Sequence, residues 1–108
     1  MNACSCIDMI DEIMEIDRIK LEKAAYILKA LAHETRLCVL MHLCKTKEKS
    51  VSDLMLELDC EQSLLSHHLT DLRAKGILNS RRDGKRNLYS INNDQIIPLL
   101  ECILNYCK

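Results

Sequence analysis

Apolar residues recur with a helical period along most of this chain. Residues 18–32 place leucines and alanines at spacings of three, four and seven within a stretch rich in strong helix formers, and leucines continue the pattern over 34–44. A shorter apolar stripe lies beside an acidic face over 7–16. The pattern predicts a short helix over 7–16 and longer helices over 18–32 and 34–44.

The middle of the chain predicts two further helices joined by a tight turn. Ser50 is suited to cap a helix over 51–58, because Asp53 can return a hydrogen bond in a variant of the capping box. The next helix is expected over 61–75, with Gly76 ending it in a left-handed conformation. Two helices connected in this way predict a helix-turn-helix.

After Gly76 the hydrophobic period changes from that of a helix to that of a strand. Residues 77–82 and 85–91 alternate as strands do, with Leu88 and Tyr89 expected on opposite faces. The dipeptide 83–84 between them, Asp-Gly, is a strong hairpin-turn signal. A hairpin in this place is the wing of a winged helix-turn-helix, so the predicted fold is mostly α with a small β-hairpin.

A final amphipathic helix is expected after Asn92 or Asn93, either of which can cap it. Pro98 fits only the first turn of a helix, so the regular part should begin later than Asn93. The apolar faces of the first and last long helices exceed what a small trihelical core can cover. We therefore expect a homodimer that buries them against each other.

The length and the cysteines narrow the class of protein. A chain of 108 residues favours one domain over 1–108, with 1–17 as an N-terminal extension that carries Cys4 and Cys6. There is no apolar run long enough to span a bilayer and no secretory-signal pattern at the start, so we expect a cytoplasmic protein without a membrane partner. In that compartment seven unevenly clustered cysteines indicate metal, metalloid or redox chemistry rather than a disulfide framework.

The charge distribution points to nucleic acid although the net charge of -1 does not. Basic residues outnumber acidic ones between Asp71 and Arg86, and this is where phosphates are expected to bind. Small polar side chains on the 61–75 helix can approach base edges. On an isolated helix such a polar face is usually only exposed to solvent. Here a basic hairpin follows the helix, and this favours binding to double-stranded DNA over simple solvation. The predicted DNA-binding residues are Gln62, Ser63, Ser66, His67, Thr70, Lys75, Arg81, Arg82, Lys85 and Arg86.

The order and spacing of several segments resemble the ArsR/SmtB family of metalloregulatory repressors. The likeness covers nearly all of 21–107. It implies a homodimer with no permanent cofactor that sits on operator DNA and leaves it when an inducer binds. The matching segments are Leu31-Ala32-His33-Glu34-Thr35-Arg36-Leu37, Leu65-Ser66-His67-His68-Leu69, Leu72, Gly76-Ile77, and the wing from Asp83-Gly84-Lys85 to Leu88-Tyr89-Ser90-Ile91.

Two sensor sites of this family are not expected here. Its zinc site uses carboxylates and histidines on the last helix, whereas residues 94–107 contain no histidine and only Asp94 and Glu101 as acids. Its Cys-Val-Cys type of cadmium and arsenic motif is replaced by Ser50-Val51-Ser52.

The first interpretation of the cysteines is a thiolate site for a metalloid or a soft metal ion. Cys4, Cys6 and Cys44 would give three thiolates around trivalent arsenic, supplied as arsenite, or around a soft divalent metal ion. Some arsenic sensors of the family resemble this layout, although the spacing differs.

A dithiol is the second reading of the cysteines. Cys38 would meet Cys102 or Cys107 and close on oxidation or persulfidation, which resembles sulfide-responsive members of the family, although their other cysteine aligns closer to Met41. In a third reading every cysteine is a packing residue. Cys60, near the start of the 61–75 helix, is interpreted as a turn-filling residue rather than a reactive one.

Other functional classes are disfavoured. His33 and His42 each stand alone among apolar residues, which favours a surface or hydrogen-bonded structural role over metal ligation. An enzyme is not expected, because the chain has no Cys-His-acid order and no glycine-rich phosphate loop. A pure interaction module is the third class, and it predicts no sequence-specific affinity for DNA.

Overall fold

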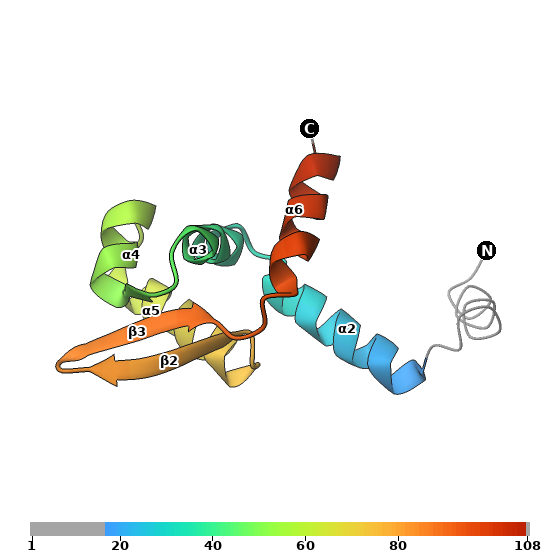
Figure 1. Cartoon of the computed structure of the whole chain (residues 1–108), viewed down its shortest axis with the longest axis horizontal. Coiled ribbons are helices and arrows are strands. Elements are labelled where there is room, and N and C mark those ends of the chain that lie inside the picture. The colour runs from blue at the N-terminus through green and yellow to red at the C-terminus, as the bar shows by residue number, and fades with distance from the viewer. Residues whose placement is uncertain (1–16, 108) are drawn as a thin grey trace. The chain divides into compact units, whose positions relative to one another are not determined.

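The computed structural model describes residues 17–107, so the helix expected over 7–16 lies outside the described residues. The described part confirms the mostly α class with a small hairpin. In chain order its elements are α2 (Arg18–Leu31), α3 (Glu34–Lys45), β1 (Lys49–Ser50), α4 (Val51–Leu58), α5 (Gln62–Ala74), β2 (Leu78–Asp83), β3 (Arg86–Ile91) and α6 (Ile96–Tyr106) (Figure 1). The chain divides into two compact units, Met1–Ala30 and Leu31–Lys108, which are described separately. The single domain over 1–108 stays a prediction.

In the first unit, α2 starts as the periodicity predicts. The Asp17 carboxylate accepts a hydrogen bond from the backbone N–H of Ile19 (2.9 Å), which satisfies one of the free donors of the first turn. Ile19, Tyr26 and Leu28 are exposed along this helix.

In the second unit, α4 contacts both α3 and α5, and leucines from these three helices form much of the core. The predicted capping box of α4 is confirmed: Ser50 Oγ accepts from the Asp53 backbone N–H and Asp53 Oδ2 accepts from the Ser50 backbone N–H, both at 3.1 Å. Gly76 has a φ of +79° immediately after α5, as expected of a left-handed helix terminator. The helical hydrophobic pattern of α3 and α5 supplies this core with the buried side chains of Leu40, Leu43, Leu65, Leu69 and Leu72, whereas Leu37 is half-buried.

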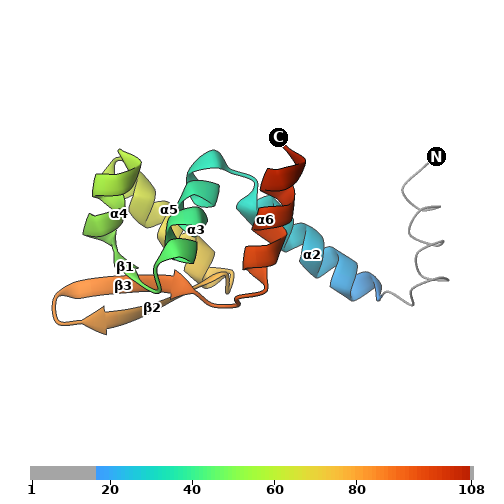
Figure 2. The ribbon, with the colours of Figure 1, turned by 45° about the horizontal axis from the view of Figure 1, so that its top comes forward.

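The hairpin belongs to a three-stranded antiparallel sheet of order β1-β3-β2, because the two-residue strand β1 pairs with β3 (Figure 2). The sequence did not predict β1, which is too short to show a period. Gly84 turns the hairpin with a φ of +64°. Leu88 and Tyr89 are adjacent on the strand, yet both are buried: β1 and β2 flank this part of β3 within the sheet, and α3 and α4 contact β3.

The last helix begins as the proline predicts. Asn93 Oδ1 accepts from the Gln95 backbone N–H (2.9 Å), α6 starts at Ile96, and Pro98 lies in its first turn. Leu100 is buried, whereas Leu99, Ile103 and Leu104 are partly exposed. Among residues 17–107, no helix is both long and apolar enough to cross a membrane.

Candidate nucleic-acid interface and thiol sites

The predicted base-reading residues lie on the exposed side of α5. Ser63, His67 and Thr70 recur at spacings of four and three and are exposed, as is Gln62, and Ser66 is half-buried. Leu65, Leu69 and Leu72 recur at the same spacings on the other side of the helix and are buried. The helical period of 3.6 produces this separation, because residues three and four apart share a face. One face of α5 thus packs in the core, and the opposite face exposes small polar side chains.

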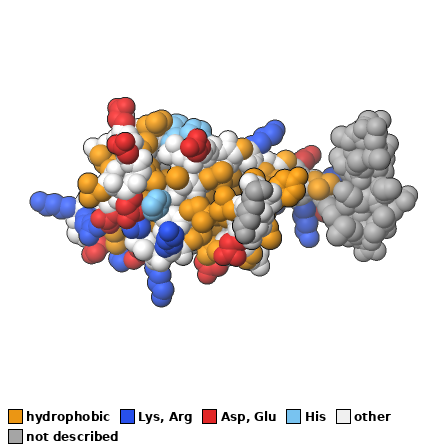
Figure 3. Space-filling view, turned by 90° about the horizontal axis from the view of Figure 1, so that it is seen from above, with side chains coloured by type: hydrophobic (Ala, Val, Ile, Leu, Met, Phe, Trp, Pro, Cys, Tyr) orange, Lys and Arg blue, Asp and Glu red, His pale blue; other side chains and the backbone are white. Residues whose placement is uncertain are grey.

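A groove of about 280 Å³ joins this face to the hairpin. It is lined by the start of α4, by Gln62 and Ser66 of α5, and by Lys85 and Arg86 of the hairpin. Figure 3 shows Lys and Arg side chains projecting at the left end of the molecule, where Figure 1 places the hairpin turn, with acidic side chains among them. Four of the predicted DNA-binding residues therefore border one concave surface.

Three of the predicted basic residues are paired with acids. Arg81 donates two hydrogen bonds to the Glu48 carboxylate, at 2.6 and 2.7 Å, and these bonds hold the pKa of Glu48 below its usual range. Arg86 contacts Asp53 at 2.9 Å, and Lys75 contacts Asp71. The acidic partners of Arg81 and Arg86 come from segments about thirty residues away, so the local charge pattern of the hairpin does not reveal them, whereas Asp71 and Lys75 share one helix.

Two other basic residues of the hairpin have no acidic partner among residues 17–107. Neither Arg82 nor Lys85 forms an ion pair with a carboxylate of residues 17–107. Arg82 donates only to the carbonyl of Gly84, at 3.4 Å.

A buried polar network, which the sequence analysis missed, connects α3 with α5. The Arg36 side chain is 12% exposed; its Nε donates to His68 Nδ1 at 2.9 Å and its Nη1 lies 2.7 Å from Asp71 Oδ2. Lys75 and Arg36 both hold the pKa of Asp71 below its usual range, the Lys75 hydrogen bond being the larger cause. The signal was present in the spacing, since His68 follows Leu65 by three and precedes Leu72 by four on the inward face of α5.

His68 is the central group of that network. Its ring lies 4.4 Å from that of His33, and its Nε2 is buried without a hydrogen-bond partner in the described part of the chain. Burial is the main cause that lowers the pKa of His68, followed by the cationic influence of His33, Arg36 and His67. Because Arg36 donates to Nδ1, we assign the proton of the neutral ring to Nε2.

The two histidines singled out in the sequence have structural roles, as predicted, but they are not isolated. His33 caps α3 by accepting from the Thr35 backbone N–H (3.1 Å), and its ring contacts that of His68 in a tilted arrangement. His42 lies 3.1 Å from the carboxylate of Glu57, which Lys49 also contacts. The Thr35 partner of His33 is local, whereas His68 and Glu57 come from segments that only the fold brings near.

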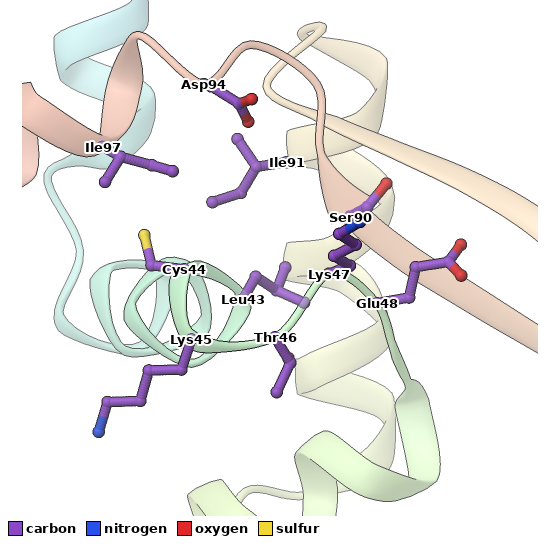
Figure 4. A pocket seen from close by; sticks show the side chains of 10 residues that line it. All are labelled: Leu43, Cys44, Lys45, Thr46, Lys47, Glu48, Ser90, Ile91, Asp94 and Ile97. Carbon is purple, nitrogen blue, oxygen red and sulfur yellow. The ribbon is translucent and has the colours of Figure 1, made fainter.

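Cys44 opens into a cavity of about 480 Å³ at the end of α3. Figure 4 shows its thiol directed towards Ile91 and Ile97, with Asp94 beyond them and the Glu48 carboxylate turned away. Burial raises the pKa of the Cys44 thiol, and the nearby carboxylates of Glu101 and Asp94 raise it further. The thiol is therefore protonated at neutral pH and lies beside two negative charges.

Both predicted cysteine sets stay predictions. Cys4 and Cys6 lie outside it, and no three His, Cys, Asp or Glu residues among 17–107 form a metal-binding group. Cys38, Cys102 and Cys107 are free and exposed, and Cys60 is half-buried.

Comparison with known proteins connects this arrangement to a family. Residues 33–80 match the model described as bacterial regulatory protein, arsR family. The HTH-type transcriptional regulator YgaV of Escherichia coli K12 is 36% identical over 87 residues, which cover 80% of this chain and 88% of YgaV.

Solved structures agree with that match. The transcriptional repressor PagR of Bacillus anthracis superposes with a TM-score of 0.73 at 33% identity, over 81% of this chain and 99% of PagR. The homodimeric winged helix-turn-helix DNA-binding domain of Mb0332 from Mycobacterium bovis gives 0.73 at 26% identity, over 83% of this chain and 82% of that one. These relatives are transcriptional regulators and not enzymes. The fold is a winged helix-turn-helix, and the chain belongs to the ArsR family of bacterial regulatory proteins.

Proposed function

We propose that this protein is a cytoplasmic, homodimeric repressor that binds double-stranded operator DNA through α5 and the hairpin. The observation that carries the proposal is the division of α5 into a buried leucine face and an exposed face of Gln62, Ser63, His67 and Thr70 beside a basic hairpin. A helix presenting small polar side chains in this position suits the major groove, and the hairpin suits the adjacent backbone or minor groove.

A homodimer fits the rest of the surface. The partly exposed apolar residues of α6, Leu99, Ile103 and Leu104, would be covered by a second copy. A two-fold dimer presents two recognition helices to a palindromic operator. The family relative Mb0332 is described as homodimeric, which supports this arrangement.

His67 provides the test of base reading. We expect His67→Ala to cost about 1–3 kcal/mol of operator binding and to leave binding to random DNA unchanged, because a base contact contributes only at the right sequence. His42→Ala, a histidine change on α3, is the matched control and should leave both affinities as they are. Equal losses on operator and random DNA would exclude base reading by His67, and a wild-type protein without any footprint on its upstream region would favour an interaction module.

For the inducer, we propose trivalent arsenic or a soft divalent metal ion bound by the thiolates of Cys4, Cys6 and Cys44. The support is the open cavity at the Cys44 thiol and the carboxylates of Asp94 and Glu101 beside it. These charges disfavour the thiolate alone but favour a divalent metal cation that displaces the thiol proton. Thiolates are the ligands that such soft ions prefer.

Removing ligands tests this site. Cys44→Ser, and separately the double change Cys4→Ser with Cys6→Ser, should abolish operator release by arsenite or cadmium and leave repression intact. Cys60→Ser is the control and should respond as the wild type does. Native mass spectrometry of the reduced protein with arsenite, cadmium and zinc would count the ions bound and the thiols consumed. Normal release by both variants would exclude the site.

A dithiol sensor is the second candidate, favoured by the exposure of Cys38, Cys102 and Cys107 as free thiols. In that case Cys38 and either partner would lose two electrons and two protons to an oxidant and form a disulfide. With a persulfide donor, one thiol would take the outer sulfur and release the donor thiol, and the second thiol would attack the resulting persulfide to form the same disulfide and release hydrogen sulfide. Reductant should then restore DNA binding whereas a chelator should not. Cys107→Ser or Cys38→Ser should abolish the response to the oxidant.

A further inference from the structure

The strand register places the arginines of the hairpin on two different faces. Residues directly opposite in an antiparallel pair share a face, and successive residues alternate. Arg81 is opposite Leu88, and Arg86 precedes Leu88 by two on β3, so Arg81 and Arg86 share one face. Arg82 is opposite Asn87, so it lies on the other face.

The face with Arg81 and Arg86 is directed at carboxylates of the protein itself. Arg81 meets Glu48 just before β1, 33 residues away, through two parallel hydrogen bonds of 2.6 and 2.7 Å. Arg86 donates from one nitrogen to Asp53 Oδ2 (2.9 Å) and Ser50 Oγ (3.0 Å), which are the two members of the α4 capping box. Ser50 is 3% exposed and hydrogen-bonded within that box, so it provides a fixed anchor.

The outer half of the hairpin has few other attachments to the protein. β1 consists of two residues and pairs only with Leu88 and Tyr89, so β3 has no second strand partner beyond them towards the turn. A two-stranded hairpin by itself is marginally stable in water. The arginine contacts are therefore well placed to fix the direction in which the hairpin projects.

Arg82 and Lys85 have a different environment. Within residues 17–107 neither has an ion pair, which is what separates Lys85 from Arg86, since both line the groove that includes Gln62 and Ser66. Ser80, on the same face as Arg82, accepts a hydrogen bond from Arg73 of α5 at 3.2 Å. Arg82 thus lies on the face of the hairpin that α5 contacts through Arg73 and Ser80.

We infer that the basic residues of the hairpin have two different roles. Arg81 and Arg86 position the hairpin through Glu48 and the α4 capping box, whereas Arg82 and Lys85 contact DNA phosphates. The inference rests on the proposed function, since it concerns how the operator is bound. A guanidinium already neutralised by a carboxylate releases no counterion from DNA unless it first leaves its partner, whereas an unpaired cation does so directly.

The salt dependence of operator binding separates the two groups. Each phosphate contact contributes about 0.9 to the slope of log K against log salt, so loss of one contact from each half of a dimer lowers the slope by about 1.8. Arg82→Ala and Lys85→Ala should show this drop. Arg81→Ala and Arg86→Ala should weaken binding at every salt concentration with the wild-type slope. A drop for Arg81→Ala or Arg86→Ala equal to that for Arg82→Ala would overturn the inference.

Changing the carboxylate instead of the arginine gives an independent measurement. Glu48→Gln keeps the Arg81 cation and removes its partner, so a positioning role predicts weaker binding, whereas a phosphate-contacting Arg81 predicts equal or tighter binding. The exchange of Arg81→Glu with Glu48→Arg should recover most of the affinity lost in Arg81→Glu alone. Circular dichroism would show whether each variant is folded.

The same measurements distinguish this inference from the proposed function. A wild-type protein without salt-dependent operator binding would refute both. Wild-type binding combined with tighter binding by Glu48→Gln would refute only the division among the arginines.

Discussion

The orientation of α5 can be tested by two identical substitutions five positions apart. Leu69 is completely buried, whereas Leu64 on the same helix is 47% exposed. If the helix presents its polar face to DNA as proposed, Leu69→Ala must damage the core and Leu64→Ala must not. Both changes replace the same side chain in the same helix, so differences in helix propensity largely cancel.

The expected magnitudes follow from burial. Leucine to alanine removes about three methylene equivalents worth ~0.8 kcal/mol each when fully buried, and the cavity left behind brings the cost of such changes into the range of about 2–5 kcal/mol. For Leu64 roughly half of the transfer contribution applies and no closed cavity forms, so about 1 kcal/mol is expected. The two variants should then differ by roughly 2 kcal/mol, or about 8–16 °C in Tm for a domain of this size.

Urea and thermal unfolding followed by circular dichroism would measure this difference. Protein concentration must be equal in all samples, because the stability of a dimer depends on it. Equal losses for the two variants, or a larger loss for Leu64→Ala, would refute the orientation of α5 and with it the face assigned to DNA.

Three further predictions concern single groups. Burial lowers the pKa of His68 in the folded state, so as pH falls below about 6.5 the unfolded chain binds a proton at this histidine before the folded chain does. The free energy of unfolding should therefore decrease from about pH 7.5 to about pH 5.5, and it should decrease less in His68→Leu. Urea midpoints at both pH values would measure this. A His68→Leu variant with the same pH dependence as wild type would contradict this. Gly84→Ala should destabilise the protein by about 1 kcal/mol through the left-handed φ alone, since nothing lies within 4 Å of an added Cβ, and Gly84→Asn should cost less; similar urea midpoints for the two would count against it. Iodoacetamide should modify exposed Cys38 before half-buried Cys44, whose pKa is raised, and peptide mass spectrometry over time would detect the reverse order if the cavity at Cys44 were more open than described.

The local elements of the fold could be predicted because their signals are local. The capping box of Ser50 and Asp53 and the helix end at Gly76 each depend on residues within a few positions, and the structure contains both. Hydrophobic period likewise separated the buried from the exposed side of α5, which is why the predicted set from Gln62 to Thr70 lies on its exposed or half-buried side.

The partners of charged and polar side chains were decided only by the tertiary structure. Arg81 with Glu48, Arg86 with Asp53, and Arg36 with His68 are each separated by about thirty residues, and no short-range pattern specifies such pairs. The sequence therefore determined how many cations the hairpin carries, and the fold determined which of them are already neutralised. Cys44 follows the same rule: its position at the end of a helix could be predicted from the sequence. The cavity and the burial that raises its pKa, with the carboxylates of Glu101 on α6 and Asp94 just before it, depend on β3 and the C-terminal segment being packed near α3.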